Sequence, residues 1–412
     1  MAIVQASTSC EARASGWKVP LAVPALGGQA WAYLKECLDT NFVSSVGPFV
    51  GRLERLVAVR VGAAHAVATV SGTSALHIAL LVAGVQPDDE VVVSTLSFIA
   101  PANAIRYVGA WPVFMDAEAT YWQMDPHKLS EFLTRECRWR DGALSNCATG
   151  RRVRAILPVH ILGHPCDMGP ILALARRYGL VVIEDATESL GATYQDKPVG
   201  HLGDIACFSF NGNKIVTAGG GGMIVTDRAD WAERATYLTT QAKDDAEEFI
   251  HQEIGYNYRL TNLQAAVGCA QMEQLDEHIA AKRRIARIYA EAFGRCPGVQ
   301  GMAEAPWAGS IWWMATALVD EEPCGMDARR VRAGLRERGI EAQPLWHSLH
   351  QNPAHAGSQA YQCDIAPQLV QRSVRLPSSV GLTADQQAWV IQQLHDLCAS
   401  GSGQIHAASR AA

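Results

Sequence analysis

The stretch CFSFNGNKIVTAGGGGMIVTD, residues 207–227, places Lys214 between an apolar, strand-like run and four consecutive glycines. A buried lysine costs free energy because its charge loses hydration, and glycines give up backbone entropy on folding. A P-loop does not explain the pattern, since it requires GxxxxGK[ST] and the order here is GNKI. A dinucleotide fingerprint fails too, because these glycines lead into another strand-like segment and not into a helix. The remaining interpretation is a Schiff-base lysine, with glycines that let the backbone approach a flat cofactor.

Strand and helix patterns alternate around this stretch. Apolar runs typical of buried strands occupy 65–71, 90–95, 111–116, 153–161, 180–186 and 204–210, and helical patterns occupy 72–84, 100–109 and 167–179. Continuous Val/Ile runs separated by helices predict an α/β fold with a mainly parallel sheet that is covered on both faces.

The C-terminal third has a different pattern. A long helical pattern over 263–293 is expected to lead into a smaller α+β part, with a strand at 310–320 and a helix at 327–339. The 412 residues, 49% of them hydrophobic, are enough for two domains. We therefore expect a large domain over 19–275, a small domain over 276–399, and flexible tails at 1–18 and 400–412, where small and polar residues prevail.

Composition limits the class of protein. A net charge of −6 argues against a general nucleic-acid binder. The eleven cysteines contain no CxxC pair, which is typical of thiols in a reducing compartment. The first twenty residues lack the apolar core of a signal peptide, and no apolar stretch approaches the roughly 20 residues that span a bilayer. The sequence predicts a cytoplasmic protein that binds neither nucleic acid nor membrane.

A ligand site is expected at the carboxyl ends of the strands, where helix N-termini present free N–H groups. Gly72 follows one strand and removes side-chain bulk, while Thr73 and Ser74 offer N–H and hydroxyl groups to a phosphate. The alternative is that Ser71 or Thr73 only caps the following helix.

Two further strand ends supply candidate residues. Asp185 ends a strand too apolar to leave an acid uncompensated, so it is interpreted as a carboxylate facing a cationic nitrogen, with a capping or salt-bridged acid as the alternative. Pyridoxal phosphate requires such a carboxylate, a lysine such as Lys214, a phosphate cup and a flat contact for its ring. Phe98 is a candidate for that contact, although a lone aromatic residue is more often part of the core.

Other polar and aromatic clusters receive structural interpretations. The segment 160–167, HILGHPCD, brings His160, His164, Cys166 and Asp167 together, but ligands this crowded without a second cluster rarely form a zinc site. We therefore expect no metal. Three tryptophans are interpreted as core or interface residues: Trp307, Trp312 and Trp313.

Five segments in this order resemble the DegT/DnrJ/StrS family of pyridoxal phosphate-dependent sugar aminotransferases: GTSALHIAL, SFIAPANAI, IEDATESLGA, FSFNGNKIVTAGGGGMI and GYNYRLTNLQAA. The resemblance covers roughly residues 20–400, and HILGHPCD is similar to the family's VHxxGxPxD segment. It implies the fold-type-I, aspartate aminotransferase-like architecture and a homodimer with active sites at the subunit boundary.

The resemblance also implies roles for individual residues. Lys214 would form the Schiff base with pyridoxal 5′-phosphate, Asp185 would pair with its pyridine nitrogen, and Phe98 would stack on its ring. The phosphate would be held by Gly72, Thr73, Ser74 and Ser209, and by Asn257 from the neighbouring subunit. Glu188 stands where relatives often have His or Gln near the phenolic oxygen, so its role stays open.

The reaction implied is amino transfer from L-glutamate, through the pyridoxamine phosphate form, to a keto sugar bound to a nucleotide. A related branch of dehydratases has His in place of the lysine, so Lys214 favours transamination. The wording FNGNKI with its glycines is most similar to enzymes that aminate C4 of UDP-2-acetamido-4-keto-2,6-dideoxy sugars. Arg259 and His347 lie in segments that line the nucleotide-sugar cleft of relatives, although His347 is also typical of a half-buried loop residue.

Two other classes stay open. One is a different pyridoxal phosphate enzyme of the same fold, such as a sugar dehydratase or a lyase. The other is a non-catalytic regulator that retains the fold, against which the intact pair of Lys214 and Asp185 argues.

Overall fold

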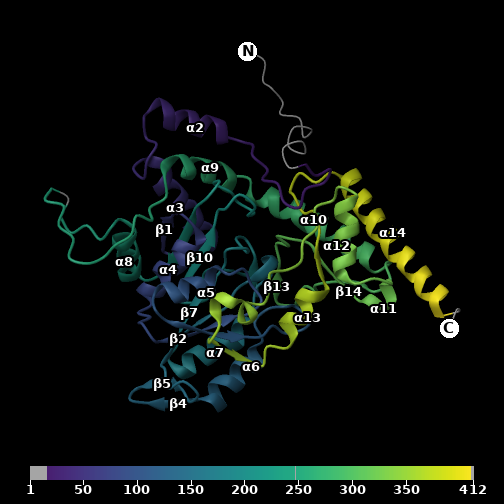
Figure 1. Ribbon diagram of the computed structural model, residues 1–412. Helices are drawn as coiled ribbons and strands as arrows, with labels where there is room; N and C mark the ends of the chain where they lie inside the picture. Colours follow the sequence, from purple (N-terminus) through teal and green to yellow (C-terminus); the bar gives the residue numbers. More distant parts are fainter. Residues whose placement is uncertain (1–15, 246, 410–412) are drawn as a thin grey trace.

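The computed structural model describes residues 16–245 and 247–409. An eight-stranded sheet lies at the centre of the larger part of the chain (Figure 1). Its strands are, in spatial order, β1 (His65–Thr69), β11 (Gly222–Thr226), β10 (Ile205–Ser209), β7 (Val181–Asp185), β6 (Val153–Leu157), β2 (Glu90–Ser94), β3 (Trp111–Met115) and β15 (Gln359–Tyr361). β11 is antiparallel to both of its neighbours and the other pairs are parallel, which confirms the predicted α/β fold with a mainly parallel sheet.

The helix α4 (Gly72–Val82) is almost entirely buried against the sheet. It packs against β10 and β11 as well as against α5 (Ala100–Tyr107) and α8 (Ala229–Thr239). A helix that is apolar nearly all round is stable only when it is buried on every side. Its start is fixed because Ser71 caps it, and this places the first turn of α4 beside the end of β10.

Other helices surround the sheet or extend from it. α3 (Pro48–Val61) packs on β1, and α7 (Met168–Tyr178) packs on β7. The remaining elements of the larger part are α2 (Ala30–Asp39), α6 (Pro126–Glu131), a π-helical turn (Phe132–Glu136), the hairpin β4 (Cys137–Arg140) and β5 (Ala143–Asn146), the 3-10 helix η2 (Ile161–Gly163), and a small sheet of β8 (Thr193–Tyr194), β9 (Lys197–Pro198) and β13 (Ala308–Gly309).

The helical pattern over 263–293 forms two helices and not the single helix that the sequence predicts. α9 (Asn262–Met272) packs on α2 and α3, whereas α10 (Leu275–Phe293) turns toward the smaller part of the chain. The buried faces of the two helices therefore differ in direction. Asp276 and Glu277 in the first turn of α10 favour a new helix start there, because acidic side chains complement the positive helix N-terminus.

The smaller part has its own hydrophobic core around an antiparallel sheet of β12 (Val299–Gly301), β14 (Thr316–Val319) and β16 (Ser373–Arg375). α12 (Ala328–Glu337) and α14 (Ala384–Ser409) lie side by side on it, next to α11 (Glu321–Cys324) (Figure 1). The strand predicted over 310–320 is wrong in its first half. Residues 310–313 form no strand, since Ser310 Oγ and the N–H of Ile311 both donate to the carbonyl of Gly163, and the strand begins at Thr316.

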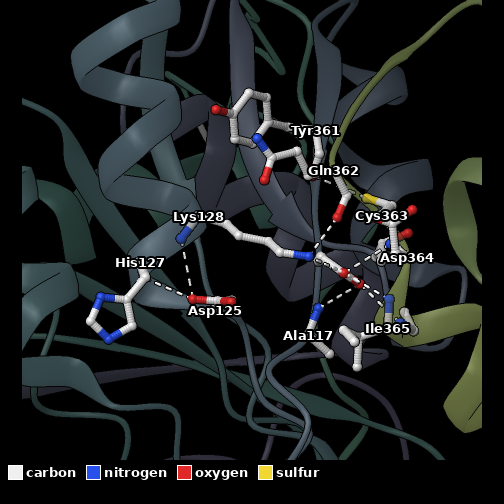
Figure 2. Close-up of polar contacts among 12 residues, drawn as sticks. Ala117, Asp125, His127, Lys128, Tyr361, Gln362, Cys363, Asp364 and Ile365 are labelled. Carbon is white, nitrogen blue, oxygen red and sulfur yellow. Dashed lines mark hydrogen bonds and ion pairs between the residues drawn. The ribbon is translucent and has the colours of Figure 1, made fainter.

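The segment between Gln359 and α13 (Ile365–Arg372) is attached to the larger sheet. β15 pairs with β3, and the buried Asp116 after β3 accepts hydrogen bonds from the backbone N–H groups of Asp364 and Ile365, each of 2.9 Å. Lys128 of α6 points to the same place, donating to Asp116 at 2.6 Å and to the carbonyl of Gln362 at 2.7 Å (Figure 2). These bonds fix the chain that returns from the smaller part.

The predicted domain limits stay a prediction. One strand from the expected small domain, 276–399, pairs with the larger sheet, so the two parts share an element. Most of the predicted N-terminal tail, 1–15, lies outside the described residues. The expected C-terminal tail begins at residue 400, and α14 extends to Ser409, so the flexibility of this tail stays a prediction. Among the helices of the described residues, none is both long and apolar enough to cross a bilayer.

Candidate active site

A cavity of about 520 Å³ lies at the carboxyl ends of β7 and β10, beside the first turn of α4. Parallel strands and the helices that follow them bring their polar ends to this edge, as expected for an α/β sheet. The cavity brings together most of the residues that the sequence singles out: Gly72, Thr73, Phe98, Asp185, Glu188, Ser209 and Lys214.

Lys214 lies in the turn that follows β10, where its backbone N–H donates to the carbonyl of Asn211 at 3.0 Å. Its Nζ atom lies 3.4 Å from Oε1 of Glu188 and 4.2 Å from the centre of the Trp313 ring. A carboxylate and an aromatic face both attract an ammonium group, and neither forms a close hydrogen bond here. The amine is therefore located in the cavity without being tightly held.

Asp185 is the last residue of β7 and is 2% exposed. Its Oδ1 atom accepts a hydrogen bond of 3.1 Å from the backbone N–H of Thr187. Burial raises the pKa of Asp185, because the charged carboxylate loses its hydration, although the bonds to Thr187 and the charge of Lys214 act against this. A buried carboxylate of this kind is stabilised by a cationic partner in the cavity.

Glu188 lies behind Lys214 and is buried. Its Oε2 atom accepts a hydrogen bond of 2.8 Å from the backbone N–H of Leu162 in η2. Burial raises the pKa of Glu188, and the charge of Lys214 partly offsets this. One oxygen is thus fixed by the fold, and the other faces the lysine.

The start of α4 forms the polar end of the cavity. Ser71 Oγ accepts the backbone N–H of Ser74 at 3.0 Å and lies 2.9 Å from Ser74 Oγ, so Ser71 is a helix cap. Ser74 itself does not line the cavity. A Cβ atom on Gly72 would lie 2.9 Å from Cβ of Ser209. Glycine therefore lets the helix start approach Ser209, and free N–H groups there suit a phosphate.

Two different structural reasons explain the glycine run after Lys214. Gly220 and Gly221 line the cavity, as expected for glycines near a flat ligand. Gly222 has a different reason, because a Cβ atom on it would lie 2.4 Å from the carbonyl oxygen of Ser71. Gly221 has a φ of 125°, a conformation that only glycine adopts readily.

The cavity also contains tryptophans whose role the sequence does not indicate. Trp313, interpreted as a core or interface residue, is buried but lines the cavity, and its Nε1 donates to the carbonyl of Asn213 at 2.8 Å. The ring of Trp346 lies parallel to it, with centroids 6.4 Å apart and an interplanar angle of 6°. Trp307 and Trp312 do not line this cavity.

Arg375, the last residue of β16, is a buried cation that also lines the cavity. It donates to the carbonyl of Pro344 and to Oε1 of Gln343, each at 2.8 Å, and its guanidinium lies 5.2 Å from the centre of the Trp346 ring. Burial lowers the pKa of Arg375, whereas the carboxylates of Glu188 and Glu341 raise it. Both acceptors are neutral oxygens, so the guanidinium retains its capacity for an anion.

Three predicted residues lie elsewhere in the chain. Arg259 forms an ion pair of 2.6 Å with Glu54. Asn257 and His347 are exposed, and neither lines the cavity. Their proposed contacts with a neighbouring subunit or a nucleotide stay predictions.

The histidines of segment 160–167 have protein partners. His160 Nε2 lies 3.1 Å from Oε2 of Glu184, and His164 bonds to the carbonyl of Pro165 and the N–H of Ala305. Burial acts to lower the pKa of His160, but Cys166 and Glu184 outweigh it and raise the value to about 10. Across 16–245 and 247–409, no three His, Cys, Asp or Glu side chains gather in an arrangement that suits a metal ion.

Sequence comparison decides the family. The sequence model of the DegT/DnrJ/EryC1/StrS aminotransferase family matches residues 24–395. The chain belongs to this family. It is therefore a pyridoxal phosphate-dependent sugar aminotransferase with the fold-type-I architecture.

Individual relatives agree with this assignment. GDP-perosamine synthase of Caulobacter vibrioides is 39% identical over 369 residues, 89% of this chain and 94% of that protein. GDP-perosamine synthase of Escherichia coli O157:H7 is 36% identical over 379 residues, 92% of this chain and 98% of that protein. The crystal structure of DesI in the presence of its TDP-sugar product superposes with a TM-score of 0.83 at 26% identity, covering 94% of each chain.

The cavity of this sugar aminotransferase fits its cofactor. Pyridoxal phosphate, when bound, supplies an electron-accepting ring that carries the amino group between two substrates. The cavity offers the amine of Lys214, the buried carboxylate of Asp185 and the aromatic face of Phe98. It also offers N–H and hydroxyl groups at the start of α4. These are the kinds of group that a flat ligand with a phosphate requires.

Proposed function

We propose that the enzyme transfers the amino group of L-glutamate to the C4 keto carbon of a nucleotide-linked 6-deoxy sugar. The first candidate acceptor is UDP-2-acetamido-4-keto-2,6-dideoxyhexose, in line with the similarity of the FNGNKI segment. The observation that carries the proposal is the position of Lys214 Nζ in the cavity, between Glu188 and Trp313.

Each cavity residue receives one task. Lys214 would hold the cofactor, and its amine would be placed to carry a proton to and from the reacting carbon. Asp185 keeps the ring nitrogen protonated, since a buried carboxylate stabilises an adjacent cation. Phe98 contacts the ring, and Gly72, Thr73 and Ser209 hold the phosphate with the free N–H groups of α4. Glu188 orients Lys214 through Oε1, the carboxylate oxygen that faces the amine.

We assign substrate recognition to three other lining residues: Arg375, Trp313 and Trp346. Arg375 presents a buried guanidinium, which binds a carboxylate of the donor through charge-assisted hydrogen bonds. Trp313 and Trp346 present aromatic faces, which suit the C–H face of a sugar ring.

The same proposal includes a homodimer in the cytoplasm. Phe98 is 55% exposed although it lines the cavity, so the cavity has an open side at this residue. Large apolar side chains are also exposed on and around α2, among them Leu26, Trp31, Leu38 and Val46. A second copy would cover these surfaces, and we assign its Asn257 to the phosphate, as the family resemblance implies.

The nucleotide has a second candidate. Relatives named GDP-perosamine synthase are 39% and 36% identical to this chain, which favours a GDP-linked acceptor as the alternative to a UDP-linked one. The two candidates share the reaction and differ only in the nucleotide and the sugar.

The test is a pair of half-reactions on the purified protein loaded with pyridoxal phosphate. L-glutamate should bleach the visible absorption band of the cofactor, and the true acceptor should restore it. UDP-linked and GDP-linked 4-keto sugars are then added separately, and the product is examined by NMR for the aminated carbon. A band that does not respond to L-glutamate would contradict the donor, and recovery with neither sugar would contradict the acceptor.

A further inference from the structure

A second cavity, of about 650 Å³, lies between α10 and the chain that connects β12 with β14. It shares no lining residue with the catalytic cavity. Its floor is apolar and buried, with the rings of Tyr289 and Phe293 stacked at 5.9 Å. We call this cavity the α10 groove. A volume of this size is typical of small-molecule sites.

Arginines on α10 form the rim of the groove. Arg283 is engaged, since it pairs with Glu304 at 2.8 Å and also donates to the carbonyl of Ser310. Arg284 and Arg287 are exposed, and within the described residues neither side chain has a hydrogen bond or an ion pair. Residues three apart face the same side of a helix, so two guanidinium groups lie together at the mouth. Glu304 is neutralised by Arg283, which leaves the rim cationic.

Trp312 supplies an aromatic side chain to the lining of the α10 groove. Its φ is 53°, which is an outlier for a bulky residue. The turn is held because Ser310 Oγ accepts the N–H of Trp312 at 3.1 Å and donates to the carbonyl of Gly163 at 3.0 Å. As a result, Trp312 lines the α10 groove while Trp313 lines the catalytic cavity. Strained backbone of this kind persists where the surrounding structure enforces it.

We propose that the α10 groove is a second binding site, and that its ligand is a nucleoside diphosphate. Its base packs against Trp312 and the apolar floor, and its phosphates bind Arg284 and Arg287. The charges support this class of ligand, because planar guanidinium groups pair with phosphate oxygens. The aromatic wall supports a flat base in place of a phosphate alone. The proposal concerns a site separate from the one that carries out amino transfer.

Calorimetric titration of the cofactor-loaded protein with GDP, and separately with UDP, tests the site. We compare the wild type with Arg284→Ala/Arg287→Ala, and use Arg329→Ala/Arg330→Ala on α12 as a control that removes two exposed arginines elsewhere. The α10 variant should lose one binding event per chain, or bind about 10- to 100-fold more weakly there, with kcat and KM of amination unchanged. The control should bind like the wild type.

The outcome is independent of the proposed reaction. If no amination is found, loss of nucleotide binding in the α10 variant still supports the groove. Equal binding by the wild type and the α10 variant overturns the proposal, as does the absence of any binding. A change of oligomeric state in the α10 variant, measured by light scattering, would assign the groove to a contact between copies and overturn it too.

A second variant tests the nature of the ligand. Trp312→Leu removes the aromatic wall but retains both arginines, so it should weaken GDP binding about tenfold and leave inorganic pyrophosphate binding unchanged. Equal weakening of both ligands would show that no base stacks on Trp312, and would overturn the assignment of a nucleotide.

Discussion

Lys214 and Glu188 form an ion pair in which both side chains are almost fully buried, 12% and 4% exposed, with 3.4 Å between Nζ and Oε1. Glu188 is itself fixed by the N–H of Leu162, so the carboxylate cannot follow the lysine far. The distance leaves room for Nζ to move between partners. The charge of Glu188 therefore influences the amine directly, so we expect the activity to depend on whether Glu188 is protonated.

The first prediction concerns pH. Burial raises the pKa of Glu188, so this carboxylate takes up a proton at a higher pH than an ordinary glutamate, and the ion pair is lost below that pH. Wild-type kcat/KM should therefore fall on the acid side. Glu188→Gln lacks this titration, so its acid limb should move to lower pH. The exposed Glu322→Gln serves as the control, and an acid limb in Glu188→Gln that matches the wild type would contradict the role.

Lys214→Ala should lose the visible band of the bound cofactor and lower kcat by at least about 10⁴-fold, because it removes both the covalent attachment and the proton carrier. The control is Lys197→Ala, a substitution of an exposed lysine. Absorption spectra and initial rates are measured for both variants. Appreciable turnover in Lys214→Ala would contradict the assignment of this lysine.

Asp185→Asn keeps the shape of the side chain but removes its charge. It should retain cofactor, since the phosphate end is intact, while kcat falls about 10²- to 10⁴-fold, because the ring nitrogen loses the partner that keeps it protonated. Cofactor content and single-turnover rates separate the two effects. A variant that loses cofactor at an unchanged rate per bound cofactor would make Asp185 a binding residue only.

Trp346→Leu tests the aromatic pair that Trp346 forms with Trp313 in the cavity. Trp346 is half-buried and stacks parallel to Trp313, so its loss should raise KM for the sugar acceptor about tenfold and change kcat little. KM for L-glutamate should stay near the wild-type value. Trp139→Leu removes an exposed tryptophan from the β4–β5 hairpin and is the control for general loss of stability.

Lys282 gives a prediction for stability. It is buried in α10 and donates to the carbonyls of Trp313, at 2.8 Å, and Ser378, and burial lowers its pKa to about 7. Between pH 7 and about 10 the unfolded chain binds more protons at this lysine than the folded one does, so its contribution to the free energy of unfolding rises with pH, by a few kcal/mol at most.

Lys282→Met should remove this rise. The melting temperature of the wild type and of the variant, measured at pH 7, 8 and 9, gives the two slopes, and Lys197→Met is the control with an exposed lysine. A variant slope equal to that of the wild type would mean that Lys282 does not titrate in this range.

Local pattern predicts the large sheet well. The runs that form β2 and β7 are continuous and apolar, and the helix at 72–84 is apolar on all sides, so period and composition agree. The pattern over 263–293 misleads, because its helical period continues through Glu273 and Gln274 while the packing direction changes there. Residues 310–313 are apolar like a strand, but a hydrogen bond to Gly163, distant in sequence, turns them.

The residues of the cavity that come from the large sheet are also predicted well from the sequence. Asp185 ends a strand, Lys214 and Gly72 come soon after strands, and such strand ends meet at one edge of a parallel sheet. Arg375 and Trp346 come from the C-terminal part of the chain, and no local pattern relates them to Lys214. Ser74 has the expected residue type and position, and its hydroxyl lies 2.9 Å from Ser71 Oγ within the cap, so its contact with the phosphate stays a prediction.

The pairing of β15 with β3 limits how this chain can be divided. A fragment that ended at the predicted boundary, residue 275, would lack β15, and the edge of β3 would offer unpaired N–H and C=O groups to any other strand. Asp116 would at the same time lose the amide donors of α13 that satisfy its buried charge. Truncated forms should therefore precipitate during expression, and labels or tags are better placed at the chain ends than between the two parts.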